Sequence, residues 1–344
     1  MAHLLEVEDL EVFFETPGDG PDVHAVRGVS FTLDQREKVG LVGESGCGKT
    51  TTLLAVAGLL APTAKISGRV VLNGQEILGL GDRAMRPHRW TEMSMIFQGS
   101  MNAFSPVTTV GRQLADAIQV RGGQPKAKAR ARARELLSLV GIPAERASSF
   151  PHQLSGGMRQ RATIALSLAC EPKIVLADEP TTALDVMVQA QVMELLDRLC
   201  DELGLALLLV SHDLMLVTEM CERLHVMYAG EIVESGSDDQ IVGAPAHPYT
   251  SRLFAATADL STSAAPVAIP GAPPRLDHPV AGCSFRSRCD KAFDRCEHEA
   301  PVLLPVRPGQ EAACHLVEDH DVGEPGLAVP GGSEFIPGGR DGSA

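Results

Sequence analysis

One octapeptide decides the fold of this 344-residue chain: Gly43-Glu44-Ser45-Gly46-Cys47-Gly48-Lys49-Thr50. It fits the pattern G-x-x-x-x-G-K-[ST], in which glycines let backbone N–H groups wrap a phosphate. Lys49 would neutralise β and γ oxygens, and the Thr50 hydroxyl could ligate Mg²⁺. The apolar residues 39–42 before the loop predict a short buried strand, and residues 50–60 after it predict a helix. This order predicts an α/β nucleotide-binding fold.

Two carboxylates follow a second apolar run. Residues 174–177 read Ile-Val-Leu-Ala, as expected for a parallel strand buried on both faces, and Asp178-Glu179 comes next. Ligands bind at the carboxyl ends of strands in open α/β sheets. We therefore expect Asp178 to hold Mg²⁺ through water and Glu179 to act as the general base on an attacking water.

Two further strands are predicted at residues 93–97 and 205–210, and each precedes a polar side chain. Gln98 follows the first strand, and His212 lies just after the second. An isolated histidine at a strand end is more often solvated than functional. Its position beside the other motifs makes His212 a candidate for the same site.

Composition limits the class of protein. With 44% hydrophobic residues the chain can form one large α/β domain and an extension. The net charge of −14 and pI of about 5.2 argue against a nucleic-acid-binding surface, which needs clustered Lys and Arg. No run reaches the roughly 18 to 20 apolar residues of a membrane-spanning helix, and no secretion signal is evident. We expect a cytosolic chain that reaches a membrane only through a partner.

Changes in composition and residue pattern along the chain predict its domain organisation. Residues 68–74 predict a β-hairpin with an Asn-Gly turn, and residues of about 100–165 predict a helical subdomain. Alternating strands and helices over 174–242 would complete one parallel sheet, so we assign residues 1–243 to the nucleotide-binding domain. A helix begins near Ala246, a Pro/Ala/Ser-rich linker covers 261–279, and 244–320 form an extension. Residues 321–344 are predicted to be disordered.

A heptad inside the helical region identifies a family. Residues 154–160 read Leu-Ser-Gly-Gly-Met-Arg-Gln, and a Ser-Gly-Gly sequence opening a helix offers a hydroxyl and unpaired N–H groups to a phosphate. The heptad resembles the signature of ATP-binding-cassette (ABC) proteins. That resemblance implies an α/β P-loop NTPase cassette: a RecA-like parallel sheet core, an antiparallel β subdomain and the helical signature subdomain.

The resemblance also implies roles for single residues. Ser155, Gly156 and Gly157 would contact the ATP bound by a second cassette, and Asp185, in Ala183-Leu184-Asp185, would lie in the loop that crosses the dimer interface. His212 would contact the γ-phosphate. Gln98 would touch Mg²⁺ and the attacking water near the transmembrane partner, although Gly99-Ser100 follows it here where the family usually has Asp-Pro. The remaining implied ATP contacts are the phosphate loop, Thr51, and Phe14 on adenine, with Phe13 as the alternative aromatic and a plain core role open for both.

Four of the eight cysteines fall near the end of the chain, at Cys283, Cys289, Cys296 and Cys314. A cytosolic location disfavours disulfides, so the cluster indicates metal, but the spacing C-x₅-C-x₆-C-x₁₇-C does not name the metal. Three arginines at positions 286, 288 and 295 could offset the negative charge of thiolates. Cys47 is different, because a thiol at a helix N-terminus tends to have a lowered pKa, although it could simply be a small residue filling the loop.

The same end of the chain resembles a particular branch of the family. His247-Pro248-Tyr249-Thr250, residues 269–274 and the tract from Gly282 to Cys314 look like the carboxyl-terminal extension of ATPase subunits of bacterial di/oligopeptide importers. Members carry a [4Fe–4S] cluster on these four cysteines; zinc and free thiols are the alternatives.

This resemblance implies an ATP- and Mg²⁺-dependent subunit at the cytoplasmic face of the inner membrane. Its partners would be a second cassette (a copy or a paralogue), two transmembrane permease subunits and, indirectly, an extracytoplasmic substrate-binding protein. The same ATPase family also serves nickel and oligosaccharides. A soluble cassette ATPase acting on DNA or ribosomes is the rival, but such proteins usually carry two cassettes or a coiled-coil insertion.

Overall fold

Two β-sheets organise the chain. The computed structural model describes residues 3–16, 18, 20–99, 103–182, 184–257 and 269–318. Within this part, a smaller antiparallel sheet has the order β2-β1-β4-β5, with β1 Leu5–Phe14, β2 Val23–Leu33, β4 Ala64–Leu72 and β5 Gln75–Glu76. The larger sheet has the order β11-β12-β10-β9-β3-β8-β7-β6, with β3 Lys38–Val42, β6 Met93–Ile96, β7 Ile174–Asp178, β8 Ala206–Val210, β9 Arg223–Tyr228, β10 Glu231–Ser237, β11 Leu304–Arg307 and β12 Gln310–Ala312.

The larger sheet is parallel at its centre and antiparallel at one edge. Strands β9, β3, β8, β7 and β6 pair in parallel, whereas β10, β12 and β11 are joined by antiparallel pairing. Every residue of β3, β7 and β8 is buried. Alternate residues of β8 enter different cores, since Leu207 and Leu209 belong to one apolar cluster and Leu208 and Val210 to the other. Burial on both faces explains why these strands are continuous apolar runs.

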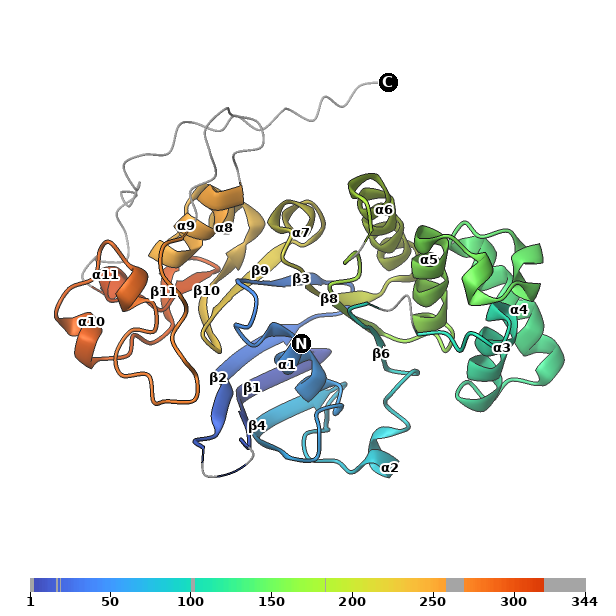
Figure 1. Ribbon diagram of the computed structural model, residues 1–344, viewed down its shortest axis with the longest axis horizontal. Helices are drawn as coiled ribbons and strands as arrows, with labels where there is room; N and C mark the ends of the chain where they lie inside the picture. The colour runs from blue at the N-terminus through green and yellow to red at the C-terminus, as the bar shows by residue number, and fades with distance from the viewer. Residues whose placement is uncertain are drawn as a thin grey trace, which may run out of the picture.

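The helices surround this sheet in separate groups (Figure 1). Helix α1 contacts both β1 and β7, α7 packs on β3, and the helical subdomain lies at the opposite end of the molecule from the cysteine segment. The bounds are α1 Lys49–Val56, α2 Asp82–Met85, α3 Val110–Val120, α4 Lys126–Leu139, α5 Gly156–Ser167, α6 Val186–Leu203, α7 Leu214–Met220, α8 Asp238–Gly243, α9 Pro248–Thr257, α10 Arg295–His298 and α11 His315–Glu318, with 3₁₀ helices η2 Ala144–Ser148, η3 Pro151–Gln153 and η5 Arg286–Arg288.

Most local predictions agree with these bounds. The strands expected around residues 39–42, 93–97, 174–177 and 205–210 are confirmed, and so is the hairpin with Asn73 and Gly74 at positive φ. Helix α1 is shorter than expected, because the chain turns at Gly58 with φ +62°. Ser100, Ala183, residues 261–268 of the predicted linker and residues 321–344 lie outside the described residues.

The parallel strands are complete by residue 242, as expected, but the large sheet continues beyond that residue through antiparallel strands. Strand β12 pairs with β10 in the register Glu234 to Ala312, and Ala313 N–H donates to the Val233 carbonyl at 2.8 Å. The cysteine segment is therefore built onto the edge of the nucleotide-binding sheet, and its position relative to the phosphate loop is set by backbone hydrogen bonds.

Candidate functional site

The phosphate loop connects β3 to α1 at the carboxyl edge of the sheet. Gly48 caps α1 with φ +106°, and a Cβ there would lie 2.6 Å from the Ala25 carbonyl oxygen. Gly43 has φ +149°, and its Cβ would lie 2.2 Å from the Met227 carbonyl oxygen. Both positions need glycine because they combine a conformation unfavourable for other residues with close backbone approach.

Lys49 folds back over this loop. Its Nζ donates to the carbonyl oxygens of Gly43, at 2.7 Å, and Glu44, at 2.9 Å, and the residue is 5% exposed. Ser45 and Gly46 are exposed at the tip, and Thr51 is half-buried in the first turn of α1. The ammonium group thus lies inside the ring of backbone amides that would hold phosphates.

Thr50 and Asp178, the two residues predicted to hold Mg²⁺, are hydrogen-bonded to each other. Thr50 Oγ1 donates to Asp178 Oδ1 at 2.9 Å, and Asp178 is 2% exposed at the end of β7. Burial raises the pKa of Asp178, opposed by the Thr50 hydrogen bond. Oxygen ligands of this kind suit Mg²⁺. The structure contains no group of three or more potential metal ligands among its described residues.

Glu179 lies at the centre of a cluster of polar side chains. Its carboxylate accepts hydrogen bonds from Gln98 Nε2 at 2.7 Å and Thr182 Oγ1 at 2.8 Å. His212 Nδ1 lies 3.4 Å from Glu179 Oε1, and the imidazole is exposed. Glu179 has φ +44°, and its N–H donates to the Val210 carbonyl of β8. A non-glycine residue held in this strained conformation is typical of a functional site.

Thr182 was not among the sequence candidates. It donates to the carboxylate from three residues downstream, in the turn that follows β7. Its position in Glu-Pro-Thr-Thr was the available signal, because a hydroxyl at i+3 can reach back to a side chain in a tight turn.

The signature heptad opens a helix as predicted. Ser155 is the N-cap of α5, and its Oγ accepts a hydrogen bond from Met158 N–H at 3.2 Å. Gly157 lies against α6, since a Cβ there would be 2.8 Å from Val188 Cγ1. Ser155 is exposed, so its hydroxyl is available to a molecule outside this chain.

Asp185 takes an equivalent position at the start of α6. Its carboxylate caps the helix by accepting from Val188 N–H at 3.0 Å. The next two side chains, Val186 and Met187, are 78% and 73% exposed. Two exposed apolar residues beside the signature helix are typical of a surface that another protein covers.

The two aromatic candidates on β1 face different surroundings. Phe13 stacks on His24, with ring centroids 3.9 Å apart, so its ring already has a partner. Phe14 is partly buried against the core between the two sheets. Phe13 therefore contacts His24 and Phe14 contacts the core, and a plain core role stays open for both rings.

The helix N-terminus does not lower the pKa of Cys47, which was the less favoured of the two interpretations. Cys47 is 5% exposed, and burial raises its pKa despite the neighbouring Lys49 ammonium group. The thiol therefore fills the underside of the loop, as the alternative interpretation held.

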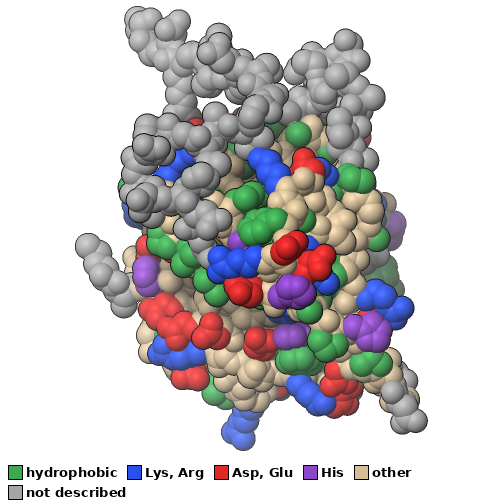
Figure 2. Space-filling view, turned by 90° about the vertical axis from the view of Figure 1, so that its left-hand side faces the viewer, with side chains coloured by type: hydrophobic (Ala, Val, Ile, Leu, Met, Phe, Trp, Pro, Cys, Tyr) green, Lys and Arg blue, Asp and Glu red, His purple; other side chains and the backbone are tan. Residues whose placement is uncertain are grey.

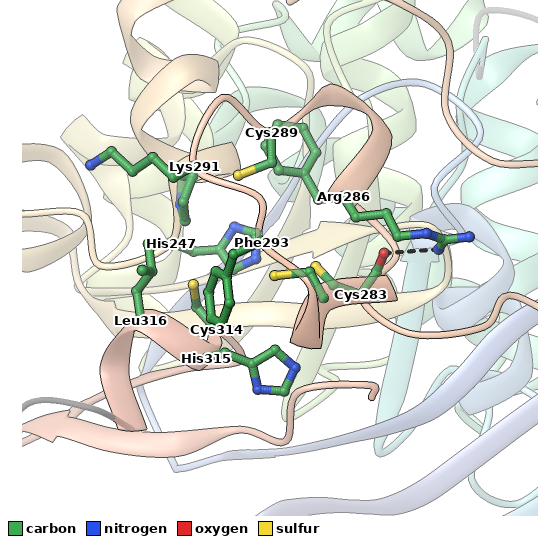
Figure 3. A pocket seen from close by; sticks show the side chains of 12 residues that line it. His247, Cys283, Arg286, Cys289, Lys291, Phe293, Cys314, His315 and Leu316 are labelled. Carbon is green, nitrogen blue, oxygen red and sulfur yellow. Dashed lines mark hydrogen bonds between the residues drawn. The ribbon is translucent and has the colours of Figure 1, made fainter. Parts of the chain in front are cut away.

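The four C-terminal cysteines line one pocket, together with His247 and Phe285. Figure 3 shows the Sγ atoms of Cys283, Cys289 and Cys314 directed into the same space. Burial raises the pKa of Cys283 to about 11 and that of Cys314 to about 12. Among the described residues these thiols form no disulfide. Thiolates are the donors that thiophilic metals and iron–sulfur clusters use, but the described residues place no three of these side chains together as a metal-binding group.

Two of the three arginines near these cysteines direct their charge elsewhere. Arg295 pairs with Glu299 at 2.6 Å, and Arg288 pairs with Glu44 in the phosphate loop, also at 2.6 Å. Arg286 lines the cysteine pocket and donates to the carbonyl oxygens of Ala281 and Cys283. The ion pairs of Arg288 and Arg295 are thus with carboxylates, and only Arg286 of the three arginines lines the cysteine pocket.

On the face that carries the cysteine segment, acidic and basic side chains are interspersed (Figure 2). None of the helices in the described ranges is long and apolar enough to span a bilayer.

Comparisons with known proteins identify the family. A family profile described as "ABC transporter" matches residues 26–182, and one described as "Oligopeptide/dipeptide transporter, C-terminal region" matches 233–296. The probable peptide ABC transporter ATP-binding protein y4tR of Sinorhizobium fredii is 46% identical, over 90% of this chain and 94% of that protein. The dipeptide transport ATP-binding protein DppD of Escherichia coli is 43% identical, over 94% and 99%.

The structural match covers the cassette. A dimeric, post-hydrolysis structure of the ATP-binding cassette MJ0796, bound to ADP and Pi, matches with a TM-score of 0.60 and 29% identity, over 68% of this chain and 98% of that one. The fold is thus an ABC cassette, and the enzyme is an ABC-type ATPase. With relatives matching over nine-tenths of its length, the chain belongs to the ATP-binding subunits of the oligopeptide/dipeptide ABC transporter family.

Proposed function

We propose that this chain couples ATP hydrolysis to the import of dipeptides or oligopeptides. The observation that carries the proposal is the carboxylate of Glu179 held by Gln98 and Thr182, with His212 at 3.4 Å. This cluster lies one residue from the Asp178–Thr50 pair. The peptide cargo is supported by the names of the relatives and by the C-terminal region shared with them.

The chemistry assigned to these residues is phosphoryl transfer to water. Lys49 and the loop amides bind the β and γ phosphates, and Mg²⁺, held from Thr50, Asp178 and Gln98, would neutralise charge on the transferring group. Glu179 takes the proton of the attacking water, while Gln98 and His212 orient that water. Phe14 stacks on adenine.

The site is completed by a second cassette. Ser155 is exposed and Gly156 and Gly157 are half-buried at a helix N-terminus, where the hydroxyl and the two amides would bind the γ-phosphate of a nucleotide held by the partner. Asp185 and the exposed Val186 and Met187 belong to the same contact surface. A copy of this chain and a paralogue are both compatible with this arrangement.

Two permease subunits would dock beside Gln98. Phe97, at the end of β6, is 45% exposed and lies next to this glutamine, so an apolar contact there could transmit closure of the cassettes. A substrate-binding protein would deliver cargo on the other side of the membrane. The chain would then act at the cytoplasmic face of the inner membrane and bind no nucleic acid.

Co-purification tests this assembly. A tagged chain extracted with mild detergent is expected to bring down two integral membrane proteins and a second cassette. Phe97→Glu should remove the membrane proteins, because it places a charge in the docking contact. Leu203→Glu is the matched control, since Leu203 is 44% exposed at the end of α6 and should retain them. Recovery of ribosomes or DNA in place of membrane proteins would contradict a transport role.

We also propose a [4Fe–4S] cluster on Cys283, Cys289, Cys296 and Cys314, in a small C-terminal domain of residues 244–320. Bound there, the cluster would cross-link the segment that extends the large sheet. The four thiols lining one pocket support this assignment. They are also compatible with zinc, which would be spectroscopically silent.

Visible absorption and metal analysis of anaerobically purified protein identify the bound metal. The intact chain is expected to be brown, with broad visible absorption and about four iron and four sulfide per chain. Cys289→Ser should lose most of this iron, whereas Cys170→Ser, a half-buried cysteine outside the segment, should keep it. Colourless protein containing one zinc would refute the cluster.

A further inference from the structure

Arg288 connects the cysteine segment to the phosphate loop. Its Nη1 lies 2.6 Å from Glu44 Oε2 and its Nη2 lies 2.9 Å from Glu44 Oε1, a bidentate pair between residues 244 apart in sequence. The Arg288 side chain is 3% exposed and that of Glu44 is 25% exposed. Bidentate arginine–carboxylate contacts are strong and fix orientation as well as distance.

The surroundings hold the guanidinium in place. Arg288 Nε donates to the Pro270 carbonyl at 2.9 Å, Nη2 donates to the Ile269 carbonyl at 3.2 Å, and the group lies 5.8 Å from the centre of the Tyr228 ring. The Glu44 carboxylate raises the pKa of Arg288, so the side chain stays charged. The position of the Arg288 guanidinium is thus set by its contacts with Pro270 and Ile269 as well as by Glu44 of the phosphate loop.

A second contact from the extension reaches the same residue of the loop. The Glu44 N–H donates to the Tyr249 hydroxyl at 2.8 Å, and Tyr249 is fully buried in α9. Both the backbone and the side chain of Glu44 are therefore held by residues that follow the cassette in sequence.

A carboxylate in this loop opposes ATP binding unless it is neutralised. Glu44 is the acidic residue of the octapeptide, and a triphosphate bound there would carry several negative charges. Lys49 does not neutralise Glu44, because its described hydrogen bonds go to Gly43 O, Glu44 O and Cys47 Sγ.

We propose that Arg288 is a positioning residue for ATP binding: it neutralises Glu44 and fixes the start of the phosphate loop, so that the cysteine segment sets nucleotide affinity. The proposal rests on ATP binding at the Lys49 loop. Arg288 lies in the turn between Cys283 and Cys289, whose sulfurs face the common pocket (Figure 3). The conformation of the cysteine pocket is thereby coupled to the phosphate loop through the Arg288–Glu44 ion pair.

A double-mutant cycle with a fluorescent ATP analogue, on the full-length chain, tests the ion pair. Arg288→Met should weaken ATP binding about tenfold, because it leaves the Glu44 charge beside the phosphates. Glu44→Gln should bind ATP at least as tightly as the parent chain, and the double variant should return to within about twofold of it. A double variant as weak as Arg288→Met would overturn the proposal, because damage to the fold is not repaired by Glu44→Gln.

Control variants separate this proposal from the assignment of the loop. Arg295→Met should leave ATP affinity unchanged, because Arg295 precedes Cys296 as Arg288 precedes Cys289 but pairs with Glu299. Lys49→Ala should abolish binding; normal binding there would refute the phosphate loop itself. If Lys49→Ala loses binding while Arg288→Met retains it, only the role of Arg288 fails. Thermal unfolding of each variant reports separately on folding.

Substitution of a cysteine that lines the pocket is the last test of this proposal. Cys289→Ser should weaken ATP binding in the parent chain, because the turn that holds Arg288 is released. The same substitution should have little effect in the Glu44→Gln background, where no carboxylate remains to be neutralised. An equal loss in both backgrounds would show that the pocket does not act through Glu44.

Discussion

Replacing Glu179 with glutamine is expected to slow ATP hydrolysis by about 10²- to 10⁴-fold while ATP still binds. Glutamine has nearly the same shape, and its Oε1 can still accept the hydrogen bonds that Gln98 and Thr182 donate. It cannot take a proton from water, so only the chemical step is lost. Phosphate release and the identity of the bound nucleotide measure the two effects.

A charge-matched control distinguishes the site from the surface. Glu202→Gln removes a carboxylate from an exposed position near the end of α6 and should leave turnover unchanged. If the Glu179 variant hydrolyses ATP at the parental rate, this residue is not the general base. The strained φ of +44° would then need another explanation.

Replacing Ser155 with arginine is expected to spare ATP binding to the Lys49 loop and reduce hydrolysis at least tenfold. The exposed Ser155 hydroxyl caps α5, and a long charged side chain there would prevent a second cassette from closing over its nucleotide. Loss of the cap alone costs about 1 kcal/mol of helix stability. Ser237→Ala controls for that cost, because Ser237 caps α8 through the same kind of hydrogen bond to Gln240 N–H.

The sequence predicted those parts of the site that depend on local chemistry. The phosphate loop, the acidic pair after β7 and the helix opened by Ser155 each depend on a few neighbouring residues whose geometry the residue types dictate. Parallel strands bring their carboxyl ends to one edge, which puts Gln98 and His212 beside Glu179, although their roles in the site were predicted from the resemblance to ABC proteins.

The contacts that were not predicted depend on long-range packing. Nothing in the local sequence indicates that Arg288 reaches Glu44, or that residues 310–312 add a strand to β10. The pKa of Cys47 also depends on long-range packing, because burial by the surrounding fold raises it despite its place at a helix N-terminus. Sequence patterns show which residues a motif requires, whereas the structure shows what those residues contact.

The claim at the centre of this account is that each ATP site needs two cassettes. The direct measurement is the amount of nucleotide retained after gel filtration by Glu179→Gln complexes, with and without Ser155→Arg. Because closure traps ATP whichever chain supplies the second cassette, the single variant should retain ATP and the double variant should release it. Equal retention by the two would mean that Ser155 takes no part in the site, and the two-cassette account would be wrong.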